Sequence, residues 1–247
     1  MALSSDLSPV TFANGGPTGY RRPASGTVAA GKVLYLGGIN LEIDGVARPA
    51  VSGTSLEALS LDCAGADADG GVFLNARRRG VRLTLTGGTS QTLRVVSITR
   101  GATIDIVIGL DTDNANAVTT TGLALELFIL GHAELTKLLR VKKKGAGTSI
   151  CATKTQTAVP CVALLGVPSE RFGDAGSGSA QTCPASLAFA VGEMHIATTS
   201  GAAPVAGSVA YLIDDNTISG TADALAPVVP VRAIQGGRYV VALQEAN

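Results

Sequence analysis

The chain has 247 residues, with 19 basic and 19 acidic side chains, so its formal net charge is zero. This balance argues against a nucleic-acid-binding protein or a protein of anionic membrane surfaces, because both are usually strongly basic. Only 15% of the residues are charged, where about a quarter is usual. So few charges predict that other protein covers much of the surface.

Targeting and redox signals point to a soluble protein that is made in a reducing cytoplasm. The N-terminus lacks the basic start and apolar core of a signal peptide. The most apolar stretch, residues 122–135, is interrupted by polar residues well before the ~20 residues that a membrane span needs. Close CxxC spacing is absent, which favours free, buried thiols over a disulfide or a metal site. The cysteines are Cys63, Cys151, Cys161 and Cys183.

The first third of the chain reads as an arm followed by short strands. Residues 1–25 are rich in proline and glycine and show little apolar periodicity, which predicts an extended arm with turns. From residue 26 onward, short β-type runs alternate with turn residues. Asp44-Gly45 between two such runs predicts a tight hairpin.

Residues 81–160 differ from the first third in that they combine strand patterns with a helix pattern. Three β runs come first, and then the only long helical text, roughly 119–139. Leu123, Leu127 and Leu130 recur at helical spacing, and Leu125, Phe128 and Ile129 widen this apolar face. We expect Gly131 to break the helix, a short second helix to follow, and the chain then to return to strand. Three strands, a helix and a strand predict a small α+β unit whose helix packs on one sheet face.

The last third returns to β text. Residues 166–186 read as a turn-rich linker, and three further β blocks follow. The predicted fold is therefore mainly β: a β-barrel or sandwich core from residues 26–80 plus 166–247, with an inserted α+β domain at 81–165 that carries one principal helix.

Two stretches resemble ligand-binding loops, but each fits a structural role better. Gly26–Val33 (GTVAAGKV) matches a phosphate-binding loop except that Val33 replaces the Ser/Thr that holds magnesium, and a strand rather than a helix follows. Asp111, Asp113, Asn114 and Asn116 crowd together like a calcium loop, but the chain has Ala115, Asn116 and Gly122 where an EF-hand needs a ligand, glycine and glutamate. We interpret the second stretch as a strand-to-helix turn, with Thr119–Thr121 offering the helix N-cap.

The remaining candidates for chemistry are sparse. His132 falls at the predicted helix break, and His195 lies in a strand with Glu193 on the same side, where the two form a surface pair or, less simply, a metal site. The basic runs 77–79 and 142–144 suit solubility and edge protection, or alternatively docking onto an acidic protein surface. We therefore expect no catalytic, cofactor-binding or metal site, and no enzyme activity.

At this point a resemblance becomes informative. Residues 104–159 resemble a module that recurs in tailed-phage virion proteins: a β run, a Gly/Asn turn, a threonine pair, a helix, a short second helix and a glycine-rich return strand. The corresponding segments are Ile104–Leu110, Asp111–Ala117, Thr119–Thr121, Leu123–Leu130, Ala133–Leu139 and Gly145–Val159. Residues 31–50 and 207–243, which include Tyr211, Asp214, Asp215 and Ile218, resemble phage capsid decoration (cement) proteins of small β-barrel type.

The resemblance implies a non-enzymatic protein of the capsid exterior, with the major capsid protein and copies of itself, as a trimer, for partners. It implies no partnership with nucleic acid or membrane and no cofactor. The arm at residues 1–25 would reach across a neighbouring subunit. Two alternatives stay open at this point: a head-fibre or tail component, and a glycan-binding β module, although the chain has no tryptophan to build an aromatic sugar platform.

Overall fold

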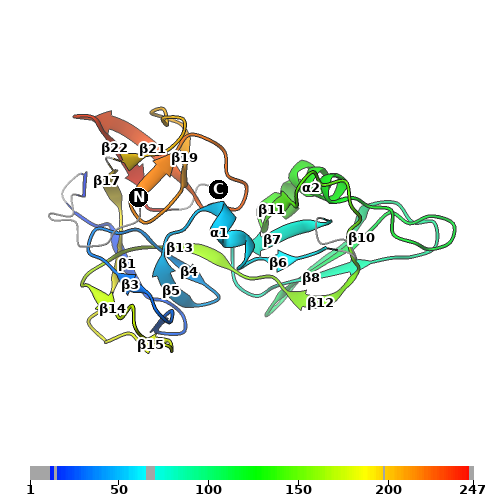
Figure 1. Cartoon of the computed structure of the whole chain (residues 1–247), viewed down its shortest axis with the longest axis horizontal. Coiled ribbons are helices and arrows are strands. Elements are labelled where there is room, and N and C mark those ends of the chain that lie inside the picture. The colour runs from blue at the N-terminus through cyan, green and yellow to red at the C-terminus, as the bar shows by residue number, and fades with distance from the viewer. Residues whose placement is uncertain (1–11, 14–15, 65–69, 197, 245–247) are drawn as a thin grey trace. The chain divides into compact units, whose positions relative to one another are not determined.

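A computed structural model describes residues 12–13, 16–64, 70–196 and 198–244. The protein is mainly β, with 44% of residues in strands and 9% in helices, and one sheet curls into a half-barrel. The predicted fold class, a β-sandwich or barrel core with an inserted α+β domain that carries one principal helix, is confirmed. The chain divides into two compact units, unit 1 (Met1–Ser55 and Val162–Asn247) and unit 2 (Leu56–Cys161) (Figure 1).

The unit boundaries differ from the predicted limits of 81 and 165. Strand β7 (Val72–Ala76) pairs along its whole length with β11 (Leu139–Lys143), so residues 56–80 belong with the inserted unit. The predicted arm also differs. Residues 1–11 and 14–15 lie outside the described residues, but β1 (Gly19–Arg21) is a paired strand, bound antiparallel to β16 (Phe189–Val191).

The described strands of unit 1 form a large sheet, a small one and a second large one. The first, seven-stranded sheet has the order β1, β16, β13 (Val162–Pro168), β4 (Asn40–Ile43), β5 (Val46–Pro49), β2 (Thr27–Val28) and β15 (Gln181–Thr182). The small sheet pairs β14 (Phe172–Gly173) with β3 (Val33–Leu34). The six-stranded sheet has the order β17 (Glu193–Ile196), β22 (Arg238–Ala242), β21 (Val228–Gln235), β19 (Val209–Leu212), β20 (Thr217–Ser219) and β18 (Thr198–Thr199).

Local sequence explains several turns of unit 1. The predicted hairpin is confirmed, since Asp44 and Gly45 join β4 to β5 with φ angles of 49° and 90°, which asparagine, aspartate and glycine tolerate best. The prediction of a linker at 166–186 is wrong, because this segment contains β14 and β15, which pair with β3 and β2. Phe189, Leu34 and neighbouring apolar side chains form a buried core here, and each such side chain contributes about 1.5–3 kcal/mol by its burial.

Unit 2 has two sheets with helices. One sheet has the order β12 (Lys154–Ala158), β8 (Val81–Thr86), β10 (Ile104–Gly109) and β9 (Arg94–Arg100); the other has the order β11, β7 and β6 (Leu61–Asp62). Strands β8 and β10 bury alternate residues, so one face of their sheet meets the core. The helices in the described residues are α1 (Gly53–Glu57), at the boundary with unit 1, α2 (Gly122–Gly131) and α3 (Ala133–Thr136).

The helix prediction is confirmed in place, but only part of the predicted apolar face is buried. Thr121 caps α2 by accepting a hydrogen bond from the N–H of Ala124, and the helix ends at Gly131. The buried side contains Gly122, Leu125 and Ile129, whereas the leucines expected to face the sheet are exposed: Leu123, Leu127 and Leu130. Apolar residues fall on every side of this helix, so periodicity could not choose the face.

Gly122 decides the choice of face, because it lets the helix N-terminus approach a backbone carbonyl. A Cβ atom at this position would lie 2.1 Å from the carbonyl oxygen of Gly71, which is part of the backbone and cannot rotate away. Only glycine fits this approach, and Leu125 and Ile129 are buried on the same helix together with it.

We therefore expect Gly122→Ala to lower the free energy of unfolding by about 1–3 kcal/mol through overpacking. The matched control is Gly131→Ala at the other end of α2, where a Cβ would meet nothing within 4 Å. Alanine is the better helix former by up to ~1 kcal/mol, so the control should be neutral or slightly stabilising. Urea unfolding of both variants measures the difference, and equal stability would refute the close-approach account.

Candidate functional site

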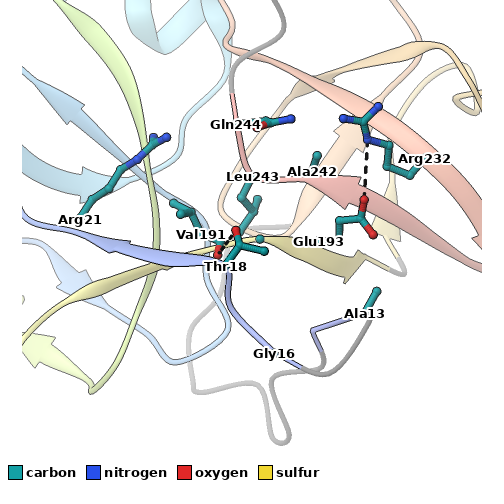
Figure 2. Close-up of a pocket in the computed structure, with 11 residues that line it drawn as sticks. Ala13, Gly16, Thr18, Arg21, Val191, Glu193, Arg232, Ala242, Leu243 and Gln244 are labelled. Carbon is teal, nitrogen blue, oxygen red and sulfur yellow. Dashed lines mark hydrogen bonds and ion pairs between the residues drawn. The ribbon is translucent and has the colours of Figure 1, made fainter.

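A cavity of about 360 Å³ lies within unit 1. It lies where the chain crosses from one large sheet to the other, between β16 and β17 (Figure 2). Hydrogen bonds hold the crossing from two sides: the N–H of Thr18 donates to the carbonyl of Val191, and the N–H of Leu243 donates to that of Gly192, both at 2.7 Å. The side chains that shape it are Thr18, Arg21, Val191, Glu193, Arg232 and Leu243.

The charged groups of this cavity stand on opposite sides. Figure 2 shows Arg21 on one side and the Arg232–Glu193 pair on the other, with Val191 and Leu243 between them. Arg21 donates from Nη1 to the carbonyl of Leu164 at 2.7 Å, and Arg232 Nε lies 3.8 Å from Glu193 Oε1, which is too far for a hydrogen bond.

A second feature adjoins the cavity: an apolar patch on the outward face of the six-stranded sheet. We define the outer patch as Val209, Tyr211, Val228 and Pro230. Val209 pairs with Pro230 and Tyr211 with Val228, so the four side chains share one face of β19 and β21. The opposite face of the same strands is buried, through Ala210, Leu212, Val229 and Val231.

Exposure makes the outer patch unusual. Val209 is 41% exposed and the other members are half-buried, and the next residue on this face of β21 is the exposed Arg232 of the cavity. A sheet with one solvated face normally alternates apolar and polar residues, whereas strands covered on both faces are apolar throughout. Strands β19 and β21 follow the second pattern with only one face covered.

The aspartate-rich stretch at 111–116 is the predicted strand-to-helix turn. Asp113 Oδ1 accepts the N–H groups of Ala115 and Ala117, and Asp111 Oδ1 accepts that of Leu93. Asn116 adopts a positive φ of 64°, which this residue type tolerates. The Oδ1 atoms of Asp111 and Asp113 thus accept backbone N–H groups, and that of Asn114 accepts the Ser90 hydroxyl at 2.9 Å. No cluster of three or more metal-ligating side chains occurs in the residues that the structure describes.

The stretch that resembles a phosphate-binding loop also folds as predicted, with a strand after it. Within Gly26–Val33, residues 27–28 form β2, a turn follows at Gly31 with φ of 64°, and β3 begins at Val33. A strand, not a helix, therefore follows the loop, and the N-terminal dipole that a phosphate needs is missing there.

The two histidines lie in different units, His132 in unit 2 and His195 in unit 1. His132 sits between α2 and α3, where its carbonyl accepts the N–H of Thr136 and its ring lies 6.2 Å from that of Phe128. His195 shares one side of β17 with Glu193, as predicted, and both are half-buried. The Glu193 carboxylate forms its ion pair with Arg232, a partner that sequence reasoning missed because the two residues are far apart in the chain.

One of the two basic runs lies outside the strands, whereas Lys142 and Lys143 of the other belong to β11. Residues 77–79 lie in the turn between β7 and β8. In the other run, Lys142 binds Glu57 at 2.5 Å and Lys144 binds Asp62 at 2.8 Å. These ion pairs within unit 2 favour a structural role for this run over docking onto an acidic surface.

The cysteines are buried and free, as predicted. Burial raises the pKa of Cys63 to about 12 and that of Cys151 to about 11. Thiols with such pKa values are almost wholly protonated near neutral pH and react poorly as nucleophiles or metal ligands.

The comparisons with known proteins give no relative for this chain. No family model, no curated protein and no solved structure matches it. Among the described residues, no helix is both long and apolar enough to cross a membrane.

The raised pKa of Cys63 predicts a stability that falls at alkaline pH. An unfolded cysteine ionises near ~8.5, whereas folded Cys63 keeps its proton to about 12. Between these values the folded state binds more protons, so the free energy of unfolding decreases as pH rises.

We expect Cys63→Ala to show a shallower decrease than the wild type in urea unfolding between pH 7 and 10.5. Cys183→Ala is the control, because Cys183 is 8% exposed whereas Cys63 is fully buried, and it should change the slope less. Parallel curves for the wild type and Cys63→Ala would contradict the prediction.

Proposed function

We propose that this protein is a virion structural protein that binds the outer surface of a phage capsid and stabilises it, as a decoration or cement protein does. The proposal starts from the resemblance of residues 31–50, 104–159 and 207–243 to phage virion proteins. The mainly β fold supports the proposal, whereas the inserted unit 2 is an addition to the minimal decoration fold.

The outer patch is the observation that carries the proposal. An antiparallel strand pair that is apolar on both faces, with one face open, is suited to contact with another protein molecule. The patch lies in unit 1, the unit that resembles decoration proteins, and on the C-terminal strands that carry the resemblance. We assign it to contact with the capsid shell.

The low charge of the chain supports the same function. A protein with 15% charged residues and zero net charge has little to repel a neighbouring copy or a shell. The partners that follow are the major capsid protein and further copies of this chain in a symmetric oligomer, for which a trimer is the proposed state.

The direct test is co-sedimentation of the purified protein with undecorated, expanded capsids of its own phage, titrated to saturation. A fixed number of copies per capsid subunit, with delayed thermal rupture of the shell, is the expected result. Binding of only a few copies per particle would instead place the protein at a vertex or on the tail, and no binding would remove the capsid function altogether.

A substitution in the outer patch should separate shell binding from folding. Val209→Glu places a carboxylate in the proposed contact, where desolvation of an unpaired charge should weaken binding by about tenfold or more, that is by at least ~1.4 kcal/mol. Val96→Glu on β9 is the control, since Val96 is 51% exposed in unit 2. Half-saturation concentrations and melting temperatures are measured for both.

Both variants should melt like the wild type, because both valines are exposed in the free protein. Wild-type shell affinity of Val209→Glu would show that the shell does not cover the outer patch.

A further inference from the structure

A second apolar surface lies on unit 2 and is formed by one side of α2. We define the leucine row as Leu123, Leu127 and Leu130, which are 39%, 60% and 55% exposed. The opposite side of α2 packs against β11 and β7 (Figure 1). Leucine side chains of this exposure on one helix face gain from burial against another protein surface.

The spacing of the leucine row points to a helix as its partner. The intervals of four and three residues place the side chains along a single seam, which is the arrangement that interdigitates with a second helix. Helices α1 and α3 have only five and four residues, so among the described residues α2 alone is long enough to present such a seam.

The charges around the leucine row allow a second identical row to lie against it. Ala124 and Gly131 flank it on one side without charge. On the other side, the Glu126 carboxylate accepts the N–H of Lys143 at 2.9 Å and is thereby held toward its own sheet. Beyond the C-terminal end, Glu134 is paired with both Arg100 and Lys137, so it needs no cation from a partner.

We infer that α2 of one molecule packs against α2 of a second copy of this chain through the leucine row. Because the row of one copy is the row of the other, the contact is two-fold and buries apolar surface on both sides without opposing like charges. It uses unit 2, and so it is distinct from the outer patch of unit 1.

The area of the row sets the strength of this contact. Three leucine side chains offer at most a few hundred Å², against the ~800 Å² that each partner of a stable complex buries. The pair is therefore weak between free molecules and strong only where molecules are held close together. On the proposed function, on which this last step rests, a capsid lattice provides that closeness, and α2 pairs join neighbouring oligomers.

The test is site-directed cross-linking. Leu127→Cys and the control Val96→Cys carry one exposed thiol each, on different elements of unit 2. The native cysteines are buried, so the wild type gives the background. Each protein is oxidised with copper phenanthroline, both free at high concentration and bound to capsids, and covalent dimer is quantified on non-reducing gels.

Leu127→Cys should form about tenfold more covalent dimer than Val96→Cys, since pairing raises the local thiol concentration. In sedimentation equilibrium at high concentration, Leu127→Glu should abolish the weak association that the wild type shows beyond its basic oligomer. Equal cross-linking at positions 127 and 96 in both settings would overturn the inference while leaving the capsid function intact. Conversely, selective cross-linking of the free protein together with no capsid binding would sustain the α2 pair and remove the proposed function.

Discussion

Unit 1 depends on one pairing, because β4 and β13 must meet although the whole inserted unit separates them in the chain. Val162 lies opposite Ile43, and the pair runs on to Gly166 opposite Asn40. All four residues of β4 are buried, so loss of this contact would expose them to solvent. Closing a long loop costs entropy that grows only slowly with its length, and a folded insertion shortens the effective loop further. Where the chain leaves unit 2, a hydrogen bond within that unit holds it: the N–H of Ala76 donates to the carbonyl of Pro160.

The sequence contained enough local information to predict the strands and the turns. The runs that became β8, β9 and β10, the Asp44-Gly45 hairpin and the Thr121 cap all rest on residues that are neighbours in the chain. What it could not show were non-local pairings. The boundary at Leu56 depends on β7 meeting β11, and the strands in 166–186 are short segments that exist only because β2 and β3 lie beside them.

The candidate site was missed for the same reason. Arg21, Glu193 and Arg232 are distant in the sequence, and nothing near any of them predicts the cavity that they share. The outer patch left a signal that could have been found, because Val228–Val231 is a continuous apolar run where a half-exposed strand should alternate. Helix α1 also has a weak sequence signal, because Ser52 directly precedes it. Its first N–H, however, donates to the carboxylate of Asp223, which is distant in the sequence.

Each unit carries one of the two apolar surfaces, the outer patch on unit 1 and the leucine row on unit 2. The outer patch belongs to paired strands, whereas the leucine row lies along one helix, so each suits a different neighbour. Neither has a dense charge pattern, and recognition through them would depend on fit and on repetition more than on electrostatic steering.

The buried thiols have a consequence for the protein in an oxidising medium. There, exposed cysteines of crowded molecules would form disulfides at random. Here burial keeps Cys63 and Cys151 protonated and out of reach. Neighbouring molecules of this protein would therefore stay free of scrambled disulfide cross-links without the help of a reductant.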